Sequence, residues 1–137
     1  MRYSFFEEMS NLKKDGKLRW SPSYLRRQGQ MTPRQKRAVR DHWSSFGLEF
    51  RYGESIDLRP AFPAATRLVL EIGFGMGDHL LHLAGQNPES GILGIEVHQP
   101  GIGAVLAEAS EAALKNLRVI RGDARLVLSD YIDGRIF

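Results

Sequence analysis

The chain has 137 residues, of which 42% are hydrophobic, 19 are basic, 16 are acidic and none is cysteine. This length suits one globular domain with a moderate core. No stretch approaches the ~18 consecutive apolar residues of a membrane helix, and the opening MRYSFFEEMSN carries acids where a signal peptide has its apolar run. Without cysteine, disulfides and zinc-thiolate sites are excluded, and we expect a cytoplasmic protein.

Positive charge is concentrated toward the beginning of the chain. Residues 1–60 hold 13 basic and 7 acidic residues, whereas residues 61–137 hold 6 and 9. The stretch from Lys13 to Arg40 has ten basic residues and one acid, interleaved with Trp20 and Tyr24. Basic and aromatic side chains together suit a polyanion with unpaired bases. A solvated basic arm is the alternative interpretation.

The first candidate helix follows an arm without sustained periodicity at residues 1–31. Thr32 suits the N-cap, with Pro33 in the first turn and Gln35 placed to complete a capping box. Gly47 suits the position just after the helix. Helical spacing relates the apolar residues Val39, Trp43 and Phe46, and the arginines fall mostly off that stripe. We expect an amphipathic helix that packs on the domain and presents guanidinium groups outward.

Beyond a connecting loop at residues 48–66, the pattern alternates between strands and helices. The run RLVLEIG is apolar enough for a parallel strand covered on both faces. Strands are expected at 67–73, 91–98 and 116–124, and helices in GDHLLHLAGQNP, with Asp78 as N-cap, and at 101–115. With right-handed crossovers, this alternation predicts half of a doubly wound parallel α/β sheet, which binds ligands at the carboxyl ends of its strands.

Acidic residues stand at the ends of all three expected strands: Glu71, Glu96 and Asp123. All three meet one edge of the sheet, where a nucleoside bound across the crevice would reach them. Glu96 follows Glu71 by 25 residues, near the spacing of about 20 at which an acid accepts hydrogen bonds from ribose hydroxyls. Singly, each acid is better interpreted as a helix cap or a solvent-facing residue, but the three together favour a nucleoside site.

The glycine pattern after the first strand narrows the class of nucleoside. Dinucleotide sites use G-x-G-x-x-G to place a pyrophosphate on a helix N-terminus, whereas this chain has Gly73, Gly75 and Gly77 flanked by Glu71 and Asp78. Carboxylates would repel a pyrophosphate but tolerate a cationic, phosphate-free ligand such as S-adenosylmethionine. Gly73 and Gly75 would let the backbone approach the ligand, and Gly77 would let the helix close on the strand.

Four stretches of the chain resemble the tRNA (guanine-N(7)-)-methyltransferase family: RRQGQMTPRQKRAV (26–39), LEIGFGMGDHL (70–80), GIEVHQPGIGAVL (94–106) and NLRVIRGDA (116–124). The resemblance covers about Arg26 to Phe137 and implies a class I, Rossmann-like enzyme. Such an enzyme transfers a methyl group from S-adenosylmethionine to guanine N(7) at position 46 of tRNA. The resemblance also implies three acidic cofactor contacts. Glu71 belongs to the motif loop, Glu96 contacts the ribose, and Asp123 lies on the adenine side. The basic arm would lie against tRNA, with Arg26, Arg27, Arg34 and Arg37 as candidate contacts.

The resemblance also implies a longer protein. In the family a fourth strand runs into a segment of the type F-F-P-D-P-W-x-K-x-R-H, which contributes to the active site, and DGRIF (133–137) would only begin that strand. We therefore assign no catalytic residue. The strand in RLVLEIG would then lie at an exposed edge of the sheet. We expect two parts, a basic arm and helix at 1–60 and the beginning of a cofactor domain at 61–137.

The leading hypothesis is an incomplete tRNA methyltransferase that is inactive by itself, because the family's continuation after the third strand is missing. Methylation of guanine N(7) would depend on alignment of the lone pair with the methyl group rather than on a strong base. One alternative is a non-catalytic RNA-binding module with structural strand-end acids. Another is a nicotinamide-dependent oxidoreductase, which the missing G-x-G-x-x-G disfavours. His79 and His82 lie three apart on one expected helix without an apparent third ligand, so no metal site is predicted.

Overall fold

The computed structural model describes residues 29–51, 54–130, 132 and 137. Its centre is a four-stranded, fully parallel sheet in the order β1-β4-β3-β2. The strands are β1 (Gly47–Leu48), β2 (Arg67–Ile72), β3 (Ser90–Glu96) and β4 (Leu117–Arg121). The helices are α2 (Pro33–Phe46), α3 (Asp78–Gln86), α4 (Gln99–Glu111) and α5 (Ala124–Asp130). The predicted α/β class with a doubly wound parallel sheet is confirmed. The predicted arm before Gly29 lies outside the described residues.

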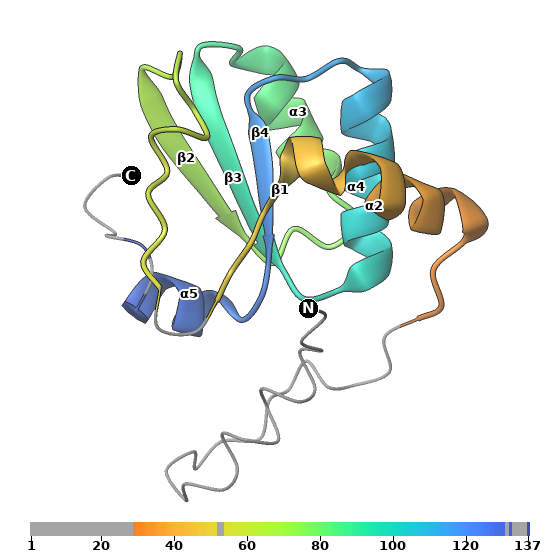
Figure 1. The fold of residues 1–137 in the computed structure, drawn as a ribbon. Coiled ribbons are helices and arrows are strands. Elements are labelled where there is room, and N and C mark those ends of the chain that lie inside the picture. Colours follow the sequence, from red (N-terminus) through yellow and green to blue (C-terminus); the bar gives the residue numbers. More distant parts are fainter. Residues whose placement is uncertain (1–28, 52–53, 131, 133–136) are drawn as a thin grey trace, which may run out of the picture.

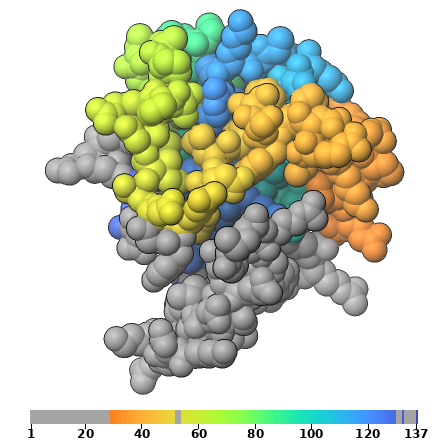
Figure 2. All heavy atoms as spheres, in the orientation of Figure 1, coloured from red at the N-terminus to blue at the C-terminus, as the bar shows by residue number. Residues whose placement is uncertain are grey.

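Two apolar layers cover the two faces of the sheet (Figure 1). Helices α2, α3 and α4 pack on one face around Ile92, Leu117 and Val119. Helix α5 and the segment between β1 and β2 cover the other face, which presents Leu93, Ile95 and Ile120. Figure 2 shows this segment, in yellow and yellow-green, crossing the near side of the molecule. Strand side chains alternate between the two faces of the sheet. Because both faces are covered, β3 is buried along its whole length.

The sequence signals at the beginning of α2 are confirmed. The Thr32 side chain accepts a hydrogen bond from Gln35 N (3.2 Å), and Gln35 Oε1 accepts one from Thr32 N (2.9 Å). The expected role of Gly47 is wrong, because it ends α2 with an extended backbone (φ −80°) rather than a left-handed one. Glycine is required there for space, since a Cβ would lie 2.2 Å from the Trp43 ring.

Several predicted boundaries shift, and two elements had not been predicted. The N-cap of α3 is Gly77, which has a left-handed backbone, and not Asp78, which is the first residue of the helix. Helix α4 starts two residues early, with a proline in its first turn, and ends at Glu111, ahead of the left-handed Ala113. Strand β1 begins at Gly47, where the sequence predicts the end of α2. Helix α5 begins at Ala124, where the sequence predicts the end of the third strand.

Strand β2 lies at an edge of the sheet within the described residues, as predicted. Its last residue, Ile72, is 55% exposed, and Met76 in the following turn is 48% exposed. The apolar surface of the sheet therefore continues to this edge. Among the helices that the structure describes, none has both the length and the apolarity to cross a bilayer.

Candidate functional site

The structure brings the three strand-end acids to one edge of the sheet. Glu71 lies on β2, Glu96 ends β3, and Asp123 follows β4 by two residues. The three strands are neighbours in parallel register, so their carboxyl ends share an edge. Backbone hydrogen bonds connect the loops after β2 and β4 to the end of β3. Gly73 N donates to Ile95 O (2.8 Å), and Gly122 N donates to Glu96 O (3.0 Å).

The turn after β2 has the backbone that only glycine adopts easily. Gly73 and Gly75 have φ values of 68° and 59°, in the left-handed region. A Cβ at either position would meet no atom within 4 Å. Open space therefore lies beside the turn, as a ligand against the backbone requires. At Gly77 a Cβ would lie 2.0 Å from Val105 Cγ2, so the close approach there is to α4 and not, as predicted, to the strand.

Glu96 is 8% exposed and joins two loops, the glycine turn and the segment between β3 and α4. Its Oε2 accepts a hydrogen bond from Gly75 N (2.8 Å), and its Oε1 accepts from Val97 N (2.7 Å) and His98 N (2.9 Å). A carboxylate offers about four acceptor positions, so three are used and one, on Oε2, remains. Glu96 therefore shapes the glycine turn and the beginning of α4, and it retains room for one further donor.

Asp123 is 6% exposed and only partly satisfied. Its Oδ1 accepts from Arg125 N (2.9 Å) at the beginning of α5. Its Oδ2 has no hydrogen-bond partner among the described residues, although Arg125 Nη2 lies 3.6 Å away. A buried carboxylate oxygen without a donor is costly. A ligand that donates a hydrogen bond at this edge would remove that cost.

Glu71 has a partner that the sequence did not reveal. Its Oε2 lies 3.0 Å from His79 Nδ1, in the first turn of α3. The Glu71 side chain is 19% exposed and the His79 side chain is 70% exposed. The imidazole therefore holds Glu71 from the solvent side. In the sequence, only the position of His79 eight residues after Glu71, across the glycine turn, suggests the contact.

Gly101 is a second position whose importance was missed, although it lies in the motif GIEVHQPGIGAVL. A Cβ there would lie 1.7 Å from Gly75 O. The first turn of α4 thus packs directly on the backbone of the glycine turn. This contact and the hydrogen bond from Gly75 N to Glu96 fix the turn from both sides.

The predicted nucleic-acid contacts fall into two groups. Arg26 and Arg27 lie outside the described residues. Arg34 Nη2 forms ion pairs with Glu108 (3.1 Å) and Glu111 (2.8 Å) on α4, and these carboxylates, Glu111 first, raise its pKa above the ordinary value. Arg34 thus docks α2 on α4 instead of only pointing outward. Arg37 is exposed.

The carboxyl edge fits S-adenosylmethionine by its hydrogen-bond acceptors and its open space. It offers the Asp123 oxygen without a partner, the remaining acceptor position of Glu96 and the carboxylate of Glu71, beside the open left-handed turn. In the part of the chain that the structure describes, no group of three or more His, Asp or Glu residues is arranged to hold a metal ion. The arrangement can bind a cationic, hydrogen-bond-donating nucleoside.

Comparison with known proteins agrees with this geometry. A family described as "Putative methyltransferase" matches residues 65–137, just over half of the chain. The chain belongs to this methyltransferase family.

The curated relatives carry a more specific name. One from Serratia proteamaculans is 48% identical over 115 residues, one from Photorhabdus laumondii is 47% identical over 120, and one from Psychromonas ingrahamii is 43% identical over 126. These alignments cover 83%, 87% and 92% of this chain and 48%, 50% and 51% of the relatives. Each relative is named tRNA (guanine-N(7)-)-methyltransferase, which confirms the resemblance identified from the sequence. The chain spans about half the length of these relatives.

Proposed function

We propose that the carboxyl edge of the sheet binds S-adenosylmethionine. The observation that carries the proposal is the buried Asp123 Oδ2 without a donor, next to an open glycine turn between two further acids. Asp123 would accept from the adenine amino group, and Glu96 would accept from a ribose hydroxyl. Glu71 would face the cationic end of the ligand. When bound, the cofactor supplies an electrophilic methyl group on sulfur.

We propose guanine N(7) at position 46 of tRNA as the methyl acceptor. The names of the relatives support guanine N(7) of tRNA, and the choice of position 46 rests on the family resemblance of the sequence. Guanine N(7) presents a lone pair without a proton, so the reaction depends on alignment more than on a general base. The residues of this chain would contribute by holding the donor and by keeping the glycine turn rigid through Glu96 and Gly101.

We propose that the basic side chains hold the tRNA. We also propose that the protein is cytoplasmic. Arg37 on the exposed side of α2, together with Arg26 and Arg27, would contact phosphates, which supply most of the sequence-independent affinity. Arg34 would do so only after leaving Glu108 and Glu111. The division between residues 1–60 and 61–137 stays a prediction, and α2 and β1 already share the core and sheet of the second part.

A non-catalytic RNA-binding module is the second candidate, and one observation favours it. Glu96 and Asp123 both accept hydrogen bonds from backbone amides near the beginnings of helices, at His98 and Arg125. These are the contacts of structural acids. The two candidates differ in one property, because only the methyltransferase requires S-adenosylmethionine to bind.

Competition binding distinguishes the candidates. We expect labelled S-adenosylmethionine to bind the chain in equilibrium dialysis and to be displaced by S-adenosylhomocysteine but not by NAD. A chain that binds tRNA and never binds S-adenosylmethionine would establish the second candidate. Displacement by NAD at similar concentration would point instead to a nicotinamide enzyme.

A transfer assay tests the remaining part of the hypothesis. We propose that methyl transfer also needs residues beyond this chain, because the chain spans about half the length of the relatives. Incubation with labelled S-adenosylmethionine and unmodified tRNA should then give binding of both without transfer of the label. Robust turnover by the 137-residue chain would refute this part and leave the cofactor site intact.

A further inference from the structure

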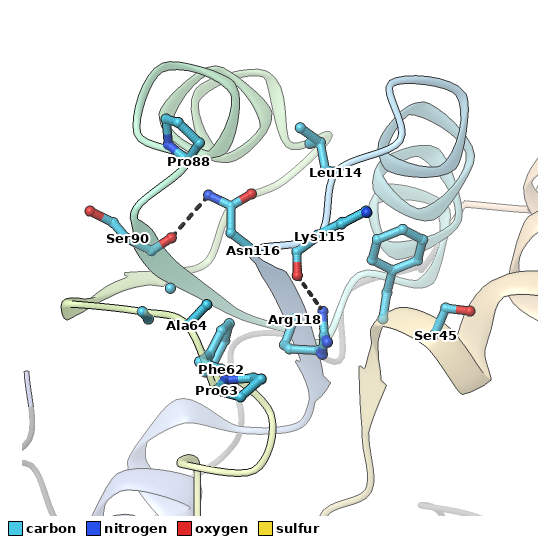
Figure 3. A pocket seen from close by; sticks show the side chains of 13 residues that line it. Ser45, Phe62, Pro63, Ala64, Pro88, Ser90, Leu114, Lys115, Asn116 and Arg118 are labelled. Carbon is cyan, nitrogen blue, oxygen red and sulfur yellow. Dashed lines mark hydrogen bonds between the residues drawn. The ribbon is translucent and has the colours of Figure 1, made fainter.

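A cavity lies at the opposite, amino-terminal edge of the sheet, where β3 and β4 begin. Its volume is about 500 Å³, and its walls come from the end of α2, the segment before β2, and the beginnings of β3 and β4 (Figure 3). In Figure 2 this region lies between the yellow-green and gold segments. Cavities of this size accommodate small organic ligands. The acids of the candidate cofactor site are all at the other end of the strands, so this cavity is separate.

The walls of the cavity combine apolar surface with positive charge. The apolar lining includes Phe46, Phe62, Leu114 and Pro88. The charged lining consists of Lys115 and Arg118, and none of the described lining residues is acidic. A cavity lined by apolar surface and cations, without a carboxylate, favours an anionic ligand that also has an apolar body.

Arg118 is oriented by its surroundings. Its Nη1 donates to Lys115 O (3.2 Å) and Leu117 O (2.7 Å). Its guanidinium carbon lies 5.7 Å from the centre of the Phe62 ring, a cation-π distance. The backbone of β4 and one aromatic ring therefore fix the guanidinium plane before any ligand arrives.

The remaining donors of Arg118 form a fork. With Nη1 engaged, Nε and Nη2 make no hydrogen bond to any described residue. Neither is a fully buried atom without a partner, so both reach open space. These two nitrogens share the side of the guanidinium that binds a planar carboxylate through two parallel hydrogen bonds. Partial burial lowers the pKa of Arg118, but the group remains charged at neutral pH.

Nothing in the described chain neutralises these two cations. Lys115 forms no ion pair with a described residue, and it is exposed at the rim. The lining is rigid at its base, because the Asn116 amide group donates to Ala84 O, Asn87 O and Ser90 O at 2.9 to 3.0 Å. A rigid cavity with unpaired cations has little to reorganise on binding an anion.

We propose that this cavity binds a small organic acid, with the carboxylate on the Arg118 fork, Lys115 beside it at the rim, and the apolar body between Phe46, Phe62 and Leu114. A carboxylate presents two coplanar oxygens that the fork can hold through two parallel hydrogen bonds. The assignment does not depend on the proposed methyltransferase function, because no residue of the carboxyl edge takes part.

Titration of the whole chain with 3-phenylpropionate tests the proposal. The readouts are the backbone amide signals of residues 114–118 and the Nε–H signal of Arg118 in nitrogen-15 spectra. We expect saturable shifts at these positions. The neutral amide of the same acid should bind at least about tenfold more weakly, because it lacks the charge that the fork recognises.

Two variants and one control sharpen the test. Arg118→Lys keeps the charge and removes the fork, so it should weaken binding at least about tenfold. Lys115→Gln changes an exposed side chain without a partner and should leave the fold intact while weakening binding a few-fold. Arg40→Lys, which changes an exposed arginine of α2 away from the cavity, should bind as the original chain does.

Four results would overturn the proposal. Shifts that never saturate would show that the cavity is only a structural hollow. Equal affinity for the acid and its amide would show apolar binding without charge recognition. Unchanged affinity in both Arg118→Lys and Lys115→Gln would exclude these cations. Tighter binding of phenyl phosphate than of phenylpropionate would replace the carboxylate assignment with a phosphate one.

Discussion

At the scale of single residues, Asp123 is a buried acid whose hydrogen-bonding capacity is only partly used in the folded chain. Its Oδ2 is buried without a hydrogen-bond donor among the described residues, while its Oδ1 caps the beginning of α5. A polar atom in this state costs free energy in the folded chain. The cost would be removed by a ligand that donates a hydrogen bond to it.

Asp123→Asn should therefore separate stability from binding. The amide oxygen can still accept from Arg125 N, so the free energy of unfolding should change little. The affinity for S-adenosylmethionine should fall at least about tenfold, because a charge-assisted hydrogen bond is lost. Urea unfolding and dialysis measure the two quantities. A variant that unfolds earlier but binds equally well would assign Asp123 a purely structural role.

His79 should act on the cofactor only through Glu71. His79→Ala removes the contact at 3.0 Å and should weaken binding of S-adenosylmethionine about two- to tenfold, as expected for one hydrogen bond. His82→Ala, on the same helix and exposed, is the matched control and should bind normally. In a Glu71→Gln background the effect of His79→Ala should disappear. An undiminished effect there would mean that His79 acts by another route.

At the scale of elements, the packing of α4 on the glycine turn determines the shape of the candidate site. The first turn of α4 approaches so closely that a Cβ on Gly101 would lie 1.7 Å from Gly75 O. Backbone atoms cannot yield as a flexible side chain can. The turn that faces the ligand is therefore held by a helix as well as by Glu96.

Two glycine-to-alanine substitutions should change the stability of the folded chain in opposite directions. Alanine normally stabilises a helix relative to glycine by about 0.5–1 kcal/mol, and Gly85→Ala in α3 should do so, because its Cβ would meet nothing within 4 Å. Gly101→Ala should instead destabilise by at least about 1–3 kcal/mol through overpacking. Thermal unfolding of both variants measures the difference. Stabilisation by Gly101→Ala would show that α4 does not pack on the turn.

The docking of α2 should compete with tRNA for Arg34. Arg37→Ala should weaken tRNA binding and reduce its salt dependence by about one unit of slope. Arg34→Ala should have a smaller effect on tRNA, because its guanidinium already pairs with Glu108 and Glu111.

Replacing both of these glutamates with glutamine should free Arg34 and strengthen tRNA binding. Filter binding over a range of salt concentrations tests all three variants. A larger loss from Arg34→Ala than from Arg37→Ala would reverse the assignment.

Periodicity and caps predicted the long elements but not the short ones. The capping box at Thr32 and the apolar run of β2 are local signals, and both were confirmed. Strand β1 has two residues and is defined by its pairing with β4, where Gly47 lies opposite Val119, 72 residues later in the sequence. Helix α5 has seven residues, too few for a clear period. Contacts that form only in the folded chain therefore define both elements: β1 pairs with β4, and α5 buries Val127 in the apolar layer.

At the scale of the whole molecule, the sheet separates two candidate binding regions. The carboxyl edge presents acids and an open turn, and the amino-terminal edge presents cations and apolar walls. The sequence predicted the first region because strand-end acids are visible in a strand pattern. It did not predict the second, because Phe46, Phe62 and Arg118 come from three distant segments that only the fold assembles.

The central claim concerns where S-adenosylmethionine binds, and a nitrogen-15 titration of the chain with this nucleoside tests it most directly. We predict saturable shifts of the amides at Gly73, Gly75 and Gly122, next to the three acids, with residues 114–118 at the other edge unchanged. Absence of saturable shifts at the carboxyl edge, or shifts confined to the amino-terminal cavity, would contradict the account.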